Sequence, residues 1–184
     1  MGSVKLGRTG LVVEKQGFGC LPIQRISKAE AVELLRRAYD GGMNYFDTAR
    51  AYSDSEEKVG AAFAGMRDRV ILATKPAAQT ADGFWKDLEV SLRTLGTDYI
   101  DIYQFHNPAF CPRPGGADGL YDAALEARSQ GKIRHIPITA WRWPMRPSTP
   151  GCMTLCNSPS ATCPAPRSWN WWRTAGRRIW ALSP

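Results

Sequence analysis

The segment Asn44-Tyr-Phe-Asp-Thr-Ala-Arg-Ala-Tyr-Ser53 carries the strongest indication of the fold, because a short apolar strand ends in polar side chains just before a helical pattern begins. The same order returns in Val70-Ile-Leu-Ala-Thr-Lys75 and in Ile100-Asp-Ile-Tyr-Gln-Phe-His106. We expect five strands at a period of about 30 residues, beginning near residues 17, 44, 70, 99 and 133. Strands that alternate with helices at this period indicate a parallel sheet with right-handed crossovers.

Four helical patterns separate the expected strands. The first begins with a capping box formed by Ser27 and Glu30, and its expected apolar stripe consists of Ala31, Leu34, Leu35 and Ala38. The second begins with Asp54 and Glu57 at the same spacing. The third and fourth end at Gly96 and Gly131, and a short hairpin that turns at Gly10 precedes them all.

The position of the polar residues favours a barrel over an open doubly wound sheet. The segment Gly17-Phe-Gly-Cys20 lacks the third glycine of a phosphate loop, whereas polar side chains follow the second, third and fourth strands in turn. With 184 residues the chain is shorter than the ~250 residues typical of a complete barrel. The sequence therefore predicts an α/β fold, an incomplete (β/α)8 TIM barrel of about five strands and four helices with an N-terminal hairpin. Its open edges predict self-association, and the strands at 70–74 and 100–105 are expected to be partly exposed.

The composition changes abruptly after residue 140. Residues 141–184 contain six of the seven tryptophans, seven of the thirteen prolines, six arginines and no Asp, Glu or Lys. We therefore expect two parts: a partial barrel at residues 1–140 and an irregular tail at residues 141–184, for which out-of-frame translation is the hypothesis. The net charge of +7 belongs almost entirely to this tail, since residues 1–140 carry 18 basic and 17 acidic groups.

Composition also narrows the functional class. Residues 1–8 show no apolar run of signal-peptide length, and no stretch of about 18 apolar residues exists, which predicts a cytoplasmic protein without a membrane partner. The five cysteines match no zinc or ferredoxin spacing, so no metal is expected.

Asp47, Tyr52, Lys75 and His106 each lie at or just past the carboxyl end of an expected strand. Alone, each residue has an ordinary structural explanation: a helix cap, a loop aromatic, a solvated strand end and a structural histidine. Active sites of barrels are built at that end of the strands, so together the four residues predict proton transfer to a carbonyl group. Asp101, inside a strand, is expected to be structural.

Several segments resemble the aldo-keto reductases in order and spacing over residues 1–140. They are Gly41-Gly-Met-Asn-Tyr-Phe-Asp-Thr-Ala-Arg-Ala-Tyr52, Ala73-Thr-Lys75, Gln104-Phe-His106 and Gly131-Lys-Ile-Arg-His-Ile136. The segment Leu21-Pro-Ile-Gln-Arg-Ile26 is similar to a bacterial branch whose members often carry a C-terminal iron–sulfur-type cysteine cluster, which this sequence lacks.

The resemblance implies a (β/α)8 barrel that transfers hydride from NADPH to a small aldehyde or ketone. Tyr52 would be the general acid, with a pKa that the ammonium of Lys75 lowers, while Asp47 would hold Lys75 and His106 would orient the carbonyl. Gly19, Cys20, Asp47 and Thr139 would lie near the nicotinamide. Loops after the later strands, which bind the phosphates in the family, have no counterpart in the sequence.

Three other interpretations remain open at the level of sequence. The chain could be a non-catalytic remnant of such an enzyme, or a Schiff-base lyase that uses Lys75 as nucleophile with Tyr52 as proton carrier. The arginines and tryptophans of the tail could bind nucleic acid, although they form no module pattern, and no nucleic-acid partner is expected.

Overall fold

The computed structural model describes residues 2–7, 9–106, 110, 112–136 and 138–139. A five-stranded sheet in the order β3-β4-β5-β6-β8 forms its centre, and every neighbouring pair is parallel. The strands are β3 (Phe18–Gly19), β4 (Tyr45–Asp47), β5 (Ile71–Thr74), β6 (Ile100–Tyr103) and β8 (Ile133–His135). All five begin within one residue of the expected positions, because short Ile-, Val- and Phe-rich runs between helical patterns mark buried parallel strands.

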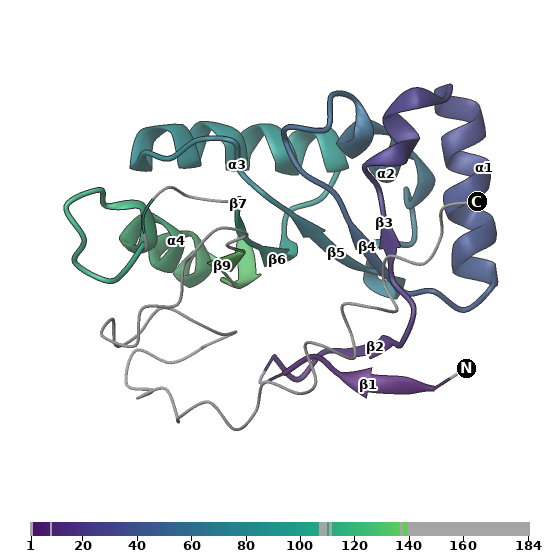
Figure 1. The fold of residues 1–184 in the computed structure, drawn as a ribbon, viewed down its shortest axis with the longest axis horizontal. Coiled ribbons are helices and arrows are strands. Elements are labelled where there is room, and N and C mark those ends of the chain that lie inside the picture. The colour runs from purple at the N-terminus through teal and green to yellow at the C-terminus, as the bar shows by residue number, and fades with distance from the viewer. Residues whose placement is uncertain (1, 8, 107–109, 111, 137, 140–184) are drawn as a thin grey trace.

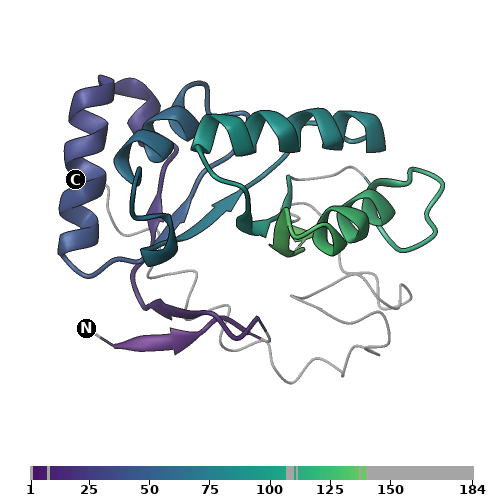
Figure 2. The same cartoon turned by 180° about the vertical axis from the view of Figure 1, so that it is seen from behind.

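Four α-helices follow the strands: α1 (Lys28–Asp40), α2 (Ser55–Ala62), α3 (Ala81–Leu95) and α4 (Leu120–Ser129). Two short 3-10 helices, η1 (Pro22–Arg25) and η2 (Arg67–Arg69), precede α1 and β5. The helices lie on one side of the sheet, with α3 running along the top of both views (Figures 1 and 2). The predicted fold class is confirmed: the chain forms the first part of a (β/α)8 barrel.

Two smaller pairs of strands accompany the sheet. β1 (Ser3–Lys5) and β2 (Val12–Glu14) form the predicted antiparallel hairpin, which lies at the opposite end of the molecule from α3 (Figure 1). β7 (Phe105–His106) pairs in parallel with β9 (Ile138–Thr139). The run expected as one strand at 100–106 is therefore broken at Gln104 into β6 and β7.

Helix α1 confirms the predicted capping box but corrects its apolar stripe. The Ser27 side chain accepts from the backbone of Glu30, whose carboxylate accepts in return from the Ser27 backbone. Leu35 is fully buried, whereas its neighbour Leu34 is 41% exposed. The stripe runs through residues 31, 35 and 38, and Leu34 lies at its margin, where the helix surface already turns toward solvent.

Helix α2 differs from the sequence-based expectation at both of its predicted capping residues. The Asp54 side chain makes no capping hydrogen bond and instead pairs with Lys58 at 2.8 Å, while Glu57 pairs with Lys28 across the surface. The charged side chains of Glu56 and Lys58 are buried. Gly60 allows this helix to approach α3 closely, since a Cβ there would lie 2.6 Å from the Thr94 carbonyl oxygen.

The core lies between the sheet and its helices. Phe46, at its centre, is fully buried and packs against Phe18 and Phe63 at ring-centroid distances of 6.0 and 4.4 Å. The side chains of β5 and β6 are also buried, apart from the half-buried Ile71. The expectation that these strands would be partly exposed is therefore wrong. Within the described residues β3 and β8 form the two edges of the sheet, and self-association through them stays a prediction.

Asp101 has the structural role that the sequence suggested. Its buried carboxylate accepts from the backbone N–H of Leu72 and pairs with Arg67 at 2.6 Å and with Arg134 at 2.9 Å. Both guanidinium groups lie over the ring of Tyr99, at 4.1 and 3.9 Å from its centroid. This cluster joins strands β6 and β8 to the segment that leads into β5.

The predicted irregular tail at residues 141–184 lies outside the described residues. Across the part of the chain that the structure describes, no helix combines the length and the apolar character needed to cross a bilayer.

Candidate active site

The four residues singled out in the sequence gather at the carboxyl ends of the strands. Asp47 ends β4, Lys75 directly follows β5, and His106 ends β7, while Tyr52 lies in the loop between β4 and α2. Lys75 Nζ lies 2.8 Å from Asp47 and 5.6 Å from the centroid of the Tyr52 ring. The rings of Tyr52 and His106 meet edge to face with centroids 6.1 Å apart. A phenol, an ammonium, a carboxylate and an imidazole thus share one rim.

All three protons of the Lys75 ammonium have acceptors. Both carboxylate oxygens of Asp47 accept at 2.8 Å, and the carbonyl oxygen of Thr48 accepts at 2.9 Å. An ammonium has three donors and no acceptor, so this set satisfies it completely. Lys75 is only 5% exposed. Burial and the hydrogen bonds to Asp47 and Thr48 therefore fix the position of its ammonium group.

Gln104 is a site residue that the sequence-based selection missed. Its side-chain Nε2 donates to Asp47 Oδ1 at 2.8 Å from the break between β6 and β7. Burial raises the pKa of the Asp47 carboxyl, and the charge of Lys75, together with hydrogen bonds from Lys75 and Gln104, opposes that rise. Two donors, one directly after β5 and one between β6 and β7, therefore orient Asp47. The sequence did contain one indication of this role: Gln104 lies two residues before His106, at the end of an expected strand.

The pKa of Tyr52 is shifted in the direction opposite to the one that the sequence predicted. Burial raises the pKa of the phenol, and the negative charge of Asp47 raises it further. The expectation that Lys75 would lower it is wrong in this state of the protein. The physical reason is that the Lys75 ammonium donates its protons to Asp47 and Thr48, and the neighbouring carboxylate offsets its charge.

His106 has a lowered pKa. Burial is the largest cause, the positive charge of Lys75 acts in the same direction, and Asp47 opposes both. An ordinary histidine has a pKa of about 6.5, so His106 is neutral at pH 7. A neutral imidazole carries one N–H donor and one acceptor, and it can donate a hydrogen bond to a carbonyl oxygen.

Buried hydrogen bonds hold the loop that carries Tyr52. Thr48 Oγ1 and Ser55 Oγ lie 2.9 Å apart, and Ser55 Oγ donates to the carbonyl oxygen of Cys20, also at 2.9 Å. Between these anchors Ser53 adopts a φ of 41°, a left-handed conformation that is uncommon for a residue other than glycine. The loop is therefore closed at its base and strained next to Tyr52.

The residues predicted near a cofactor differ in how accessible they are. Gly19 is exposed, pairs with Asp47 in the sheet, and has open space where a Cβ would project. Cys20 is fully buried, and its N–H donates to the Asp47 carbonyl oxygen at 2.7 Å, so contact with a cofactor would require it to become exposed. Thr139 pairs with His106 through the backbone of β9, and its side chain lies outside the described residues.

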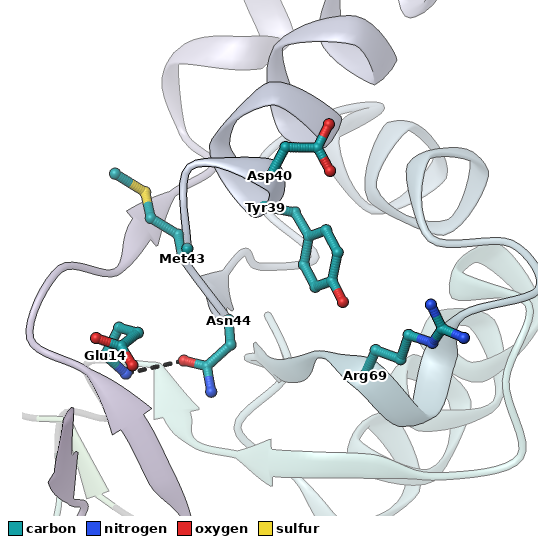
Figure 3. Close-up of a pocket in the computed structure, with 7 residues that line it drawn as sticks. Glu14, Tyr39, Asp40, Met43, Asn44 and Arg69 are labelled. Carbon is teal, nitrogen blue, oxygen red and sulfur yellow. Dashed lines mark hydrogen bonds between the residues drawn. The ribbon is translucent and has the colours of Figure 1, made fainter. Parts of the chain in front are cut away.

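A pocket of about 430 Å³ lies at the other end of the strands (Figure 3). It is lined by Glu14, Tyr39, Asp40, Gly42, Met43, Asn44 and Arg69. Asn44 and Arg69 come just before β4 and β5, so this pocket opens at the amino ends, away from Asp47 and Lys75. In barrels this face contributes to stability rather than to catalysis. Among the described residues no group of three or more His, Cys, Asp or Glu side chains could hold a metal ion.

Comparison with known proteins agrees with the geometry. Residues 15–145 match the profile of the Aldo/keto reductase family. The chain is 34% identical over 152 residues to an uncharacterised oxidoreductase of Bacillus subtilis, covering 75% of this chain and 48% of that protein. It is 32% identical over 155 residues to a 6-dehydroglucose reductase of Novosphingobium aromaticivorans, covering 73% and 50%.

Solved structures give the same result. An aldo-keto reductase from Klebsiella pneumoniae in complex with NADPH superposes with a TM-score of 0.63 at 32% identity, covering 70% of this chain and 46% of that chain. One from Bacillus halodurans, in its holo form, gives a TM-score of 0.68 at 31% identity, covering 77% and 51%. The chain thus spans about half the length of the curated relatives it matches.

Proposed function

Because the chain belongs to the aldo/keto reductase family, we propose that it is an oxidoreductase that reduces a small aldehyde or ketone to the alcohol with NADPH. The observation that carries the proposal is the convergence of Tyr52 and His106 beside the Lys75–Asp47 ion pair. These side chains come from three successive strand ends, so the fold itself brings them together.

The residues at the rim fit the nicotinamide end of the cofactor. Gly19, which pairs with Asp47 in the sheet, has no atom within 4 Å of where a Cβ would project, which supports the approach of a flat ring there. The structure of the Klebsiella pneumoniae relative contains NADPH, which supports the choice of cofactor. Bound NADPH would supply the hydride, and Gly19 and Asp47 are the described residues that would lie against its ring.

In the proposed reaction Tyr52 donates the proton to the carbonyl oxygen. A phenol has an ordinary pKa of about 10 and the pKa of Tyr52 is raised above it, so the donor is protonated at neutral pH. Neutral His106, in edge-to-face contact with the Tyr52 ring, would donate a hydrogen bond to the same oxygen and orient it. The Lys75 ammonium, 5.6 Å from the ring centroid, would stabilise the phenolate that Tyr52 becomes after the transfer.

The geometry at Lys75 argues against the Schiff-base lyase. A nucleophilic lysine must be neutral and must reach its substrate. Lys75 is 5% exposed, and its Nζ donates to both carboxylate oxygens of Asp47 and to the carbonyl oxygen of Thr48. The lysine is therefore placed to supply a fixed positive charge rather than to attack a carbonyl carbon.

The experiment that tests the proposal is a measurement of NADPH oxidation by the full chain with a panel of small aldehydes and ketones. NADPH-dependent consumption of at least one carbonyl, with the matching alcohol as product, is the expected result. The binding of NADPH is measured separately by quenching of tryptophan fluorescence. A folded chain that does not bind millimolar NADPH would instead identify a non-catalytic remnant.

A further inference from the structure

Glu56 is a charged residue in the interior, close to the site but outside the group of four. It lies in the first turn of α2 and is only 1% exposed. Its carboxylate accepts from Thr74 Oγ1 at 2.7 Å and from Ser91 Oγ at 2.8 Å, and it forms an ion pair with Arg50. Three segments, namely the Tyr52 loop, the end of β5 and helix α3, thus meet at one carboxylate.

The partners of Glu56 are the immediate neighbours of the proposed catalytic residues. Thr74 directly precedes Lys75 in the chain. Arg50 lies two residues before Tyr52, and its backbone N–H donates to the Lys75 carbonyl oxygen at 3.0 Å. The carboxylate of Glu56 therefore links the segment that carries the phenol to the segment that carries the ammonium.

The loop that carries Tyr52 has an unfavourable backbone conformation that other contacts must hold in place. Ser53, adjacent to Tyr52, has a φ of 41°. A left-handed conformation of this kind is unfavourable for a residue with a side chain. It persists only where contacts with the surrounding structure hold it in place. The Arg50–Glu56 ion pair and the contact between Thr48 and Ser55 supply that constraint, because each joins the two ends of the loop.

We propose that Glu56 is a positioning residue that sets the place of the Tyr52 phenol relative to Lys75, through Arg50 on one side and Thr74 on the other. Its effect on turnover rests on the proposed function, whereas its effect on Tyr52 does not. A buried ion pair is weak evidence for a stabilising role, since apolar residues often replace such pairs without loss of stability. The partners of Glu56 lie on the two segments that carry Tyr52 and Lys75, and this arrangement favours a positioning role for Glu56.

The test compares Glu56→Gln with Glu57→Gln in the full chain. Glu57 is the neighbouring residue, 57% exposed at its side chain, and pairs with Lys28 at the surface. Glu56→Gln keeps the size of the side chain but turns an amide group toward Arg50, which frees the loop. We expect kcat to fall about 100-fold in Glu56→Gln, as for a small misplacement of a catalytic group, and to stay within about twofold in Glu57→Gln.

A spectroscopic measurement separates this inference from the proposed function. The pKa of Tyr52 is obtained from tyrosinate absorbance, as the difference between each variant and the same variant carrying Tyr52→Phe. Release of the loop in Glu56→Gln exposes the phenol, so its pKa falls toward the ordinary value of about 10. Glu57→Gln leaves that pKa unchanged. This measurement remains informative in a chain that reduces no carbonyl, so an absence of turnover in the wild-type chain would refute only the proposed function.

Arg50→Gln provides a second route if Glu56→Gln does not fold, because the Arg50 side chain is 23% exposed. It removes the same link from the loop side, and we expect the same fall in kcat and in the Tyr52 pKa. A folded Glu56→Gln or Arg50→Gln protein whose Tyr52 titrates as in the wild type would overturn the inference.

Discussion

Lys75 Nζ donates to both carboxylate oxygens of Asp47 at 2.8 Å and lies over the ring of Tyr52, 5.6 Å from its centroid. Because the ammonium is paired with Asp47, it does not lower the pKa of Tyr52, which burial and the charge of Asp47 raise. In this state the site holds a protonated acid beside a fixed ion pair. In the proposed reaction the positive charge of Lys75 would stabilise Tyr52 once the phenol has given up its proton.

Replacing Asp47 is expected to lower the pKa of Tyr52. Asp47→Asn removes the charge that, after burial, contributes most to the raised pKa, and it leaves Lys75 without its charged partner. Tyrosinate absorbance, taken as the difference from the Asp47→Asn/Tyr52→Phe double variant, measures the change. Asp40→Asn, at the exposed end of α1, is the matched control. An unchanged titration in Asp47→Asn would show that Asp47 does not influence the phenol.

His106 is expected to give the protein an acid-sensitive component of stability. Its folded-state pKa is lowered, whereas in the unfolded chain it is close to 6.5, so folding favours the neutral ring. This contribution is complete above pH 6.5 and is lost as the pH falls through the folded-state value. Denaturant unfolding at pH 7.5 and pH 5 should show a smaller pH dependence in His106→Asn than in the wild type. Equal pH dependence in the two proteins would contradict the proposed environment of this ring.

Two adjacent leucines test the orientation of α1. Leu35 is fully buried and Leu34 is 41% exposed, although the sequence placed both on the apolar stripe. Leu35→Ala should lower the free energy of unfolding by about 2–5 kcal/mol through lost burial and a cavity. Leu34→Ala should lower it by about 1 kcal/mol or less. Denaturant titration of the two variants measures the difference, and equal losses would mean that the helix is rotated from the orientation described.

Asp101 is expected to be essential to stability rather than to catalysis. Asp101→Asn leaves Arg67, whose side chain is 16% exposed, without its carboxylate and weakens the link between β5, β6 and β8. Removal of one partner of a buried ion pair costs about 3–5 kcal/mol. Thermal and denaturant unfolding against Glu57→Gln, an exposed acidic control, would reveal the loss. A change of less than about 1 kcal/mol would refute the structural role.

The sequence predicted the strands, the helices and the meeting of the four site residues because these depend on local patterns. The Ser27–Glu30 capping box, the spacing of apolar side chains and the order of the strands are all visible along the chain. Parallel topology then brings the strand ends to one rim, so the side chains at residues 47, 75 and 106 could be placed together.

Features that depend on distant partners could not be predicted in the same way. Gln104 is 57 residues from Asp47, and Glu56 is 35 residues from Ser91, so their roles follow from packing and not from a motif. Glu56 and Lys58 have the appearance of a solvated helix surface in the sequence, yet both are buried. The direction of the Tyr52 pKa was wrong for a related reason: proximity of Lys75 could be expected, but the acceptors of its three protons could not.

The sharpest test of the proposed proton donor is the rate of NADPH-dependent carbonyl reduction in Tyr52→Phe, compared with the wild type and with Tyr39→Phe. Tyr39 is a half-buried tyrosine that packs edge to face on Phe63 and lines the pocket at the amino ends of the strands, the end opposite to Asp47 and Lys75. We predict that Tyr52→Phe lowers kcat by about 100-fold or more, as expected for removal of a general acid, while Tyr39→Phe leaves it within about twofold. A Tyr52→Phe protein that reduces the carbonyl as fast as the wild type would show that the phenol is not the donor.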